Sequence, residues 1–258
     1  MRYLFFTICI FLSASNVFAA IHTETVEYKQ GDVLLEGYLA YDDALAGKRP
    51  GVLVVHEWKG IVPYTKTRAE KLASLGFVAF AADIYGKGIR PQSNEEAAQQ
   101  AGIYKNDRSL MRERAKAGLN VLQNHALVDP KRVAAIGYCF GGTTVLELAR
   151  SGANLKGVVS FHGGLGTPNP TDIKNFKGKI LVLHGADDPF VSLMEVLAFQ
   201  DEMQKGKADW QFISYGNTVH SFTNPDAGTD SSKGAAYNKL SDERSWEVMK
   251  QFFAEIFK

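Results

Sequence analysis

A cysteine between two glycines is the feature of this sequence most able to do chemistry. Residues 137–141 read G-Y-C-F-G, which places Cys139 two residues from a glycine on either side. The apolar run 132–136 before it predicts a buried strand, and 143–149 has the spacing of a helix. A glycine-flanked turn between a strand and a helix holds its central residue in a strained, exposed conformation. Cys139 is therefore predicted to be a nucleophile; the alternative is a small buried hydrophobic residue.

A thiol nucleophile needs a base to take its proton and an acid to orient that base. Asp188 follows a predicted strand over 180–183, and His220 follows a predicted strand that ends at residue 215. The order nucleophile, acid, histidine is the one found when the nucleophile lies on a strand-to-helix turn. We therefore expect Asp188 to orient His220, with Asp187 as the alternative acid and His184 as the alternative base.

The rest of the chain alternates between strand-like and helix-like segments. Predicted strands cover 26–28, 33–41, 52–55, 78–82, 132–136, 155–161, 180–183 and 210–215, and predicted helices cover 67–75, 93–122 with interruptions, 143–149, a segment from 192 and 242–257. Capping boxes are predicted at Ser93 and Ser192. This order predicts one α/β domain with a doubly wound, mostly parallel sheet and antiparallel strands at its start. Sites in such sheets lie at the carboxyl ends of the strands, where the three candidate residues fall.

The amino terminus predicts export. One positive charge, an uncharged apolar run and small residues ending at Ala19 are typical of a signal peptide over 1–19, which leaves a single domain over 20–258. Cleavage would remove Cys9, one of two cysteines, and leave Cys139 unable to form an intramolecular disulfide. We expect the mature protein in the periplasm or secreted, without a membrane anchor. The net charge of +1 favours neither nucleic acid nor an anionic membrane as a partner.

Five segments carry a resemblance to a known family. They are 55–60 (V-H-E-W-K-G), 83–86 (D-I-Y-G), 137–142 (G-Y-C-F-G-G), the turn 185–191 and the segment 216–222. Together they cover nearly all of the predicted mature chain, and in this order they resemble the dienelactone hydrolase family. That family is a branch of the α/β-hydrolases with a cysteine nucleophile, so the resemblance implies an α/β-hydrolase fold and hydrolysis of esters or lactones.

The resemblance also implies roles for residues outside the triad. Glu57 matches the glutamate that pairs with the thiol in an alternative orientation and helps to form the thiolate when substrate binds. Such help has a physical reason, since an ordinary thiol is mostly protonated at neutral pH. The backbone N–H groups of Phe140 and Trp58 would form the oxyanion hole.

The sequence departs from the family where the substrate is held. The arginine that follows the catalytic histidine by four positions in well-known members is Asn224 here. Lys87 and Arg90 stand near the place of a second family arginine, and either could bind an anionic group. One cationic clamp is therefore missing or moved, which weakens the prediction of a small anionic dienelactone and strengthens that of a neutral or bulkier ester. The expected substrate-binding residues are Tyr85, Lys87, Arg90, His162, Ser221 and Phe222.

The sequence as a whole predicts an exported hydrolase that cleaves a small ester or lactone through a thiol acyl-enzyme. We expect no metal and no organic cofactor, because the histidines are scattered and no phosphate-binding loop follows a strand. A monomer and a homodimer both remain open. The alternatives are a general carboxylesterase or thioesterase of the same fold and a catalytically silent member that binds a ligand. A redox role has less support, because no second cysteine would resolve an oxidised Cys139.

Overall fold

The computed structural model describes residues 21–258. The predicted signal peptide over 1–19 lies outside the described residues. No helix of the described part is long and apolar enough to cross a membrane.

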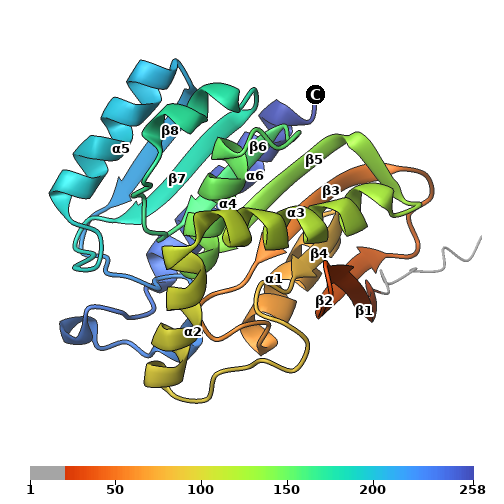
Figure 1. The fold of residues 1–258 in the computed structure, drawn as a ribbon, viewed down its shortest axis with the longest axis horizontal. Helices are drawn as coiled ribbons and strands as arrows, with labels where there is room; N and C mark the ends of the chain where they lie inside the picture. Colours follow the sequence, from red (N-terminus) through yellow and green to blue (C-terminus); the bar gives the residue numbers. More distant parts are fainter. Residues whose placement is uncertain (1–20) are drawn as a thin grey trace, which may run out of the picture.

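One eight-stranded sheet runs through the described chain (Figure 1), with the strand order β1-β2-β4-β3-β5-β6-β7-β8. The strands are β1 (Ile21–Gln30), β2 (Val33–Asp42), β3 (Arg49–Val55), β4 (Val78–Ala82), β5 (Val128–Tyr138), β6 (Gly157–Phe161), β7 (Lys179–Gly185) and β8 (Asp209–Tyr215). From β4 to β8 neighbouring strands are parallel, whereas β1 pairs antiparallel with β2 and β2 pairs antiparallel with β4. This arrangement confirms the predicted mostly parallel sheet with antiparallel strands at its start.

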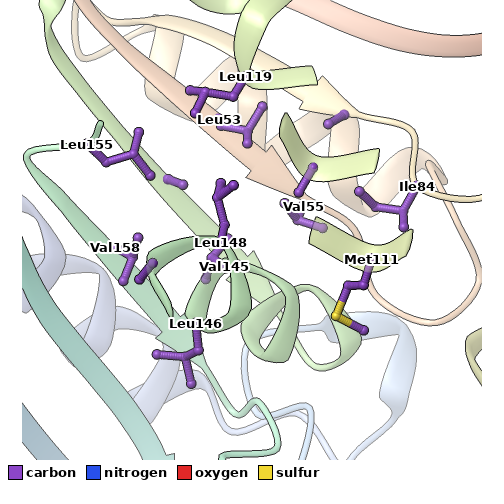
Figure 2. Close-up of a cluster of buried hydrophobic side chains, with 14 of the residues drawn as sticks. Leu53, Val55, Ile84, Met111, Leu119, Val145, Leu146, Leu148, Leu155 and Val158 are labelled. Atoms are coloured by element: carbon purple, nitrogen blue, oxygen red, sulfur yellow. The ribbon is translucent and has the colours of Figure 1, made fainter. Parts of the chain in front are cut away.

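Helices cover both faces of this sheet. They are α1 (Pro63–Ala73), α2 (Asn94–Asn106), α3 (Arg108–Asn124), α4 (Phe140–Arg150), α5 (Leu193–Gly206) and α6 (Lys239–Ile256), with short 3₁₀ turns η1 (Pro170–Asn175), η2 (Pro225–Ala227) and η3 (Ser231–Lys233). One apolar core joins the sheet to α2, α3, α4 and α5, and a second joins it to α1 and α6. Figure 2 shows part of the first core, where Leu53 and Val55 of β3 lie among side chains of α3 and α4. Side chains alternate between the two faces along a strand, so both cores draw on the same apolar runs.

Several helix ends differ from the prediction: α1 begins at Pro63 and not at 67, and α4 begins at Phe140 and not at 143. The helical region predicted over 93–122 is two helices, because the Asp107 side chain accepts a hydrogen bond from the Leu110 N–H and starts α3. Asn238 caps α6 in the same way, so this helix begins at 239 and not at 242. Ser93 forms the complete predicted capping box. At Ser192 only half of the box forms, because the Glu195 carboxylate binds backbone N–H groups of the loop after β6 instead.

Candidate active site

Cys139 lies at a sharp turn between β5 and α4, with a backbone φ of 54° that side chains rarely adopt. The glycines around it are needed because other backbone passes close by. A Cβ atom on Gly137 would lie 2.0 Å from the Gly141 oxygen, and one on Gly141 would lie 2.2 Å from the Val55 oxygen. The packed turn therefore holds the cysteine at the carboxyl end of the central strands, where its side chain remains partly exposed.

His220 and Asp188 meet across two loops at the same end of the sheet. The Nδ1 atom of His220 lies 2.8 Å from Oδ2 of Asp188, and the Asp188 side chain is fully buried. The other Asp188 oxygen accepts the N–H of Phe190 at 2.9 Å, which fixes the carboxylate. Asp187, the alternative acid, is exposed to solvent. His184, the alternative base, makes no hydrogen bond through its Nδ1 within the described chain.

The electrostatic surroundings favour a charged His220. Burial by itself lowers the pKa of His220. The adjacent Cys139 sulfur and the hydrogen-bonded Asp188 carboxylate raise this pKa by more than burial lowers it, so that it is about 10. An imidazolium is therefore stable beside a thiolate in this site. The loop that carries the histidine is held by backbone hydrogen bonds, since the His220 N–H donates to Gly234 and its carbonyl accepts from Ala236.

Glu57 is brought to this site by the loop after β3. Its side chain is almost entirely buried, and its carboxylate accepts Nδ2 of Asn224 at 2.6 Å and Oγ of Ser221 at 3.4 Å. Burial raises the pKa of Glu57, an effect that Asn224 and the charge of His220 partly oppose. In the sequence Asn224 stands only where a family arginine is missing, whereas the structure shows it as the hydrogen-bond partner of Glu57. This carboxyl group is therefore held by neutral donors alone.

The two backbone N–H groups expected to form the oxyanion hole have no acceptor among the described residues. Phe140 is the first residue of α4, so its N–H has no partner inside the helix. Trp58 lies in a turn closed by a hydrogen bond from the Gly60 N–H to the Glu57 carbonyl, and its own carbonyl accepts the Tyr85 hydroxyl at 2.9 Å. Within residues 21–258, neither the Phe140 N–H nor the Trp58 N–H donates to a protein acceptor. Both can therefore serve as oxyanion donors.

The two expected anion-binding residues already have partners. The Lys87 ammonium pairs with Glu27 of β1. The Arg90 guanidinium donates to the carbonyls of residues 61, 86 and 89 and lies 3.7 Å from Asp83 and 3.9 Å from Glu36. Lys87 thus forms an ion pair at the surface, and Arg90 connects the loop after β3 to the loop after β4 through hydrogen bonds. Neither cation is left free for a substrate.

The remaining candidate residues for substrate binding differ in how far their side chains are exposed. His162 and Phe222 are completely buried and lie 5.1 Å apart, ring to ring, so neither has surface to offer a substrate. Tyr85 is also buried, and its ring lies 5.3 Å from that of Phe140, the residue after Cys139; burial and then the nearby Cys139 sulfur raise the pKa of its hydroxyl. Ser221 remains partly exposed with a φ of 55° and donates to Glu57.

His56, which also ends a strand, is a core residue. Its side chain has no exposed surface, and burial lowers its pKa to about 4. Nε2 accepts the Ile84 N–H at 3.2 Å, so Nδ1 carries the proton and donates to the Glu57 carbonyl at 2.6 Å. The neutral ring thereby holds the backbone at Glu57, next to the site.

Phe190 and Thr223 border the site but were not predicted from the sequence. Phe190 is 61 % exposed, and its ring lies edge-on to His220 at 5.3 Å. Only its position two residues after Asp188 hinted at this place. Thr223 is buried and binds His162, and nothing in its local sequence distinguishes it from other threonines.

Two surface hollows, of about 360 and 480 Å³, lie away from these residues. The first is lined by residues such as Leu75, Phe77 and Phe253, and the second by residues such as Gln30, Glu113 and Asn120. Neither hollow is lined by Cys139, Asp188 or His220, so neither is part of the candidate active site.

Comparisons with known proteins identify the family of this chain. The model of the dienelactone hydrolase family matches residues 35–257. A solved structure named m3DLH is 41 % identical with a TM-score of 0.89, and it covers 93 % of this chain and 100 % of its own. The dienelactone hydrolase-like promiscuous phosphotriesterase P91 from metagenomic libraries has the same identity and coverage and a TM-score of 0.88.

One named relative is a protein from Bradyrhizobium. It is a probable 2-oxo-3-(5-oxofuran-2-ylidene)propanoate lactonase, 31 % identical over 78 % of this chain and 86 % of its own. The putative carboxymethylenebutenolidase of Aquifex aeolicus is 26 % identical over 91 % of this chain and 99 % of its own. The family match, the fold and these relatives agree: the chain belongs to the dienelactone hydrolase family and is a hydrolase that acts on ester or lactone bonds.

Proposed function

We propose that this protein hydrolyses an uncharged carboxylic ester or lactone through a thiol acyl-enzyme formed on Cys139. The observation that carries the proposal is the strained turn that presents Cys139 beside His220, whose Nδ1 is bonded to Asp188. A thiol needs such a base, and the bond to Asp188 leaves the Nε2 atom of His220 for the thiol proton.

The reaction then runs in two halves. The thiol passes its proton to His220, and the thiolate sulfur bonds to the carbonyl carbon while the oxygen takes up negative charge. The N–H groups of Phe140 and Trp58 stabilise that oxygen. When the tetrahedral intermediate collapses, the carbon–oxygen bond of the ester breaks and the leaving alkoxide takes the proton from His220. Water, deprotonated by His220, attacks the thioester, and Cys139 leaves as the acid product is released.

The charges around the nucleophile support an uncharged substrate. Glu57 is a buried carboxyl group whose hydrogen-bond donors, Asn224 and Ser221, carry no charge. Lys87 and Arg90 already pair with carboxylates. A substrate carboxylate would therefore meet the Glu57 carboxyl group without a compensating cation from Lys87 or Arg90, and the His220 imidazolium already pairs with Asp188.

The test is turnover of matched esters that differ in charge alone. The purified protein is mixed with a neutral aryl ester and with its analogue bearing a carboxylate on the acyl chain, and intact mass is recorded alongside product release. We expect the neutral ester to have the higher kcat/KM, and a thioester adduct that Cys139→Ala lacks. Turnover of the neutral ester that persists in Cys139→Ala would exclude the thiol mechanism.

A second candidate activity is hydrolysis of a phosphotriester, which the name of P91 motivates. A phosphotriester is uncharged, like the substrates proposed above, and its phosphoryl oxygen needs the same two N–H donors. Thiolate attack on phosphorus would expel an aryl oxide, and water would then release the diester from sulfur. Phosphorus NMR of an aryl dialkyl phosphate incubated with the protein tests this; an unchanged spectrum, with ester turnover intact, would reject it.

Export remains part of the proposal. The pattern of residues 1–19 supports cleavage after Ala19, so a protein expressed with its own amino terminus should be recovered outside the cytoplasm. Amino-terminal sequencing of that fraction should begin at Ala20. Full-length protein retained with the cytoplasmic fraction would contradict export.

A further inference from the structure

One buried histidine joins the backbone of the nucleophile to the loop of its base. His162 follows β6 directly and has a φ of 41°, in the left-handed region that a non-glycine residue adopts at a cost. Its Nδ1 atom accepts the Cys139 N–H at 3.1 Å, a hydrogen that is shared with the Phe161 carbonyl at 3.0 Å, and its Nε2 atom lies 2.7 Å from Oγ1 of Thr223. Thr223 comes three residues after His220, so one side chain contacts both halves of the catalytic pair.

These hydrogen bonds define the protonation of His162. Because Nδ1 accepts a backbone N–H, the single proton is on Nε2 and is donated to Thr223. Burial lowers the pKa of His162 well below its ordinary value, and the positive charges of His220 and Arg68 lower it further. The ring of His162 lies 5.2 Å from that of His220. A neutral His162 thus allows its neighbour to carry the positive charge that a Cys139 thiolate needs.

The far end of the bridge is anchored in the helices on the other face of the sheet. Oγ1 of Thr223 exchanges a hydrogen bond of 2.6 Å with the hydroxyl of Tyr64 on α1. The Thr223 carbonyl accepts the Arg68 guanidinium, which also pairs with Asp242 of α6 at 2.6 Å. Thr223 is therefore held in place by α1 and α6, and His162 links the cysteine turn to it through hydrogen bonds.

We propose that His162 is a positioning residue that keeps Cys139 and His220 at the separation needed for proton transfer, acting through Thr223. This inference rests on the proposed function, in which His220 takes the proton of Cys139. His162 itself touches no substrate, because its side chain has no exposed surface.

The matched control is His184, at the end of the neighbouring strand β7. It is a buried histidine as well, and burial lowers its pKa too. Its Nδ1 atom has no hydrogen-bond partner in the described chain, and no bond joins it to the cysteine turn. His162→Phe and His184→Phe thus each remove a buried imidazole on which the charge of His220 acts, but only the first breaks the bridge.

A second pair of variants tests the bridge from its other end. Thr223→Val keeps the shape of the side chain and removes Oγ1, whereas Thr223→Ser retains the oxygen. The serine variant should rescue what the valine variant loses. This pair keeps the test available if His162→Phe fails to fold.

The measurement is the rate at which iodoacetamide alkylates Cys139 between pH 5.5 and 10, with kcat and KM for one neutral ester measured in parallel. Both His162→Phe and Thr223→Val remove the hydrogen bond between His162 and Thr223, and loss of one such bond corresponds to roughly a tenfold change. At pH 6.5 we expect alkylation to slow about tenfold in His162→Phe and Thr223→Val, with kcat falling and KM little changed. At pH 10, where thiols are ionised without help, the rates should converge with wild type.

The outcomes separate the inference from the proposed function. Alkylation profiles and kcat values like those of wild type, in folded His162→Phe or Thr223→Val, would overturn the bridge. An equal loss in His184→Phe or in Thr223→Ser would also overturn it, because the effect would then be general to the core. Absence of ester turnover in wild type would reject the proposed function, whereas the alkylation profiles would still decide the role of His162.

Discussion

Replacing Asp188 by asparagine should remove most of the activity and leave the fold intact. The two side chains have the same shape, and the buried carboxylate makes its bond to His220 at 2.8 Å. Asparagine cannot stabilise an imidazolium by charge, and its amide can turn an N–H toward the Nδ1 atom that must remain protonated. A hydrogen bond between charged groups contributes about 1.5–3 kcal/mol, which corresponds to a loss of roughly 10- to 150-fold in kcat/KM.

The control for this change is the neighbouring acid. Asp187→Asn removes the same charge one residue earlier, but that side chain is exposed to solvent. We expect kcat/KM for a neutral ester to stay within twofold of wild type in Asp187→Asn.

The pH profile gives a second readout. The Asp188 carboxylate is one of the groups that raise the pKa of His220 to about 10, so imidazolium should be less stable in Asp188→Asn and alkylation of Cys139 at pH 6.5 should slow. If Asp188→Asn retains wild-type kcat/KM and alkylation, or if Asp187→Asn shows the greater loss, the assignment of the acid is wrong.

Three further predictions follow from particular contacts. Gly141→Ala should abolish soluble, folded protein or activity, because its Cβ would lie 2.2 Å from the Val55 oxygen; circular dichroism and turnover check this, and a fully active variant would contradict it. Glu57→Gln should raise stability at pH 8, because burial raises the pKa of Glu57 and a raised carboxyl pKa costs stability as pH rises above its unfolded value near 4.5. Thermal unfolding should show this gap closing toward pH 4.5, and a gap that grows on acidification would refute it. Glu202→Ala should cost about 1.5–3 kcal/mol in urea unfolding, because the buried guanidinium of Arg150 loses the carboxylate 2.7 Å away and keeps only Glu147, 3.1 Å away; a cost below 1 kcal/mol would contradict this.

Local sequence was enough to predict the elements and the cysteine turn. Continuous apolar runs identify strands buried on both faces, and glycines around Cys139 report close backbone contact that the structure shows directly. The order of strands and helices predicted the sheet, and the family motifs predicted the enzyme class that the comparisons show. These features depend on residues that are close together in the chain, and this is why the sequence alone predicts them.

Contacts between distant segments decided the rest. Nothing near Lys87 in the sequence shows that its ammonium group forms an ion pair with Glu27 on the antiparallel β1. Asp188 and Asp187 differ by one position, and only the packing of their turn buries one of them and exposes the other. His162 and Phe222 follow strand ends like true site residues, yet the loops that fold over them leave no surface for a substrate. A sequence specifies which groups are present, but burial and pairing depend on which segments tertiary packing brings together.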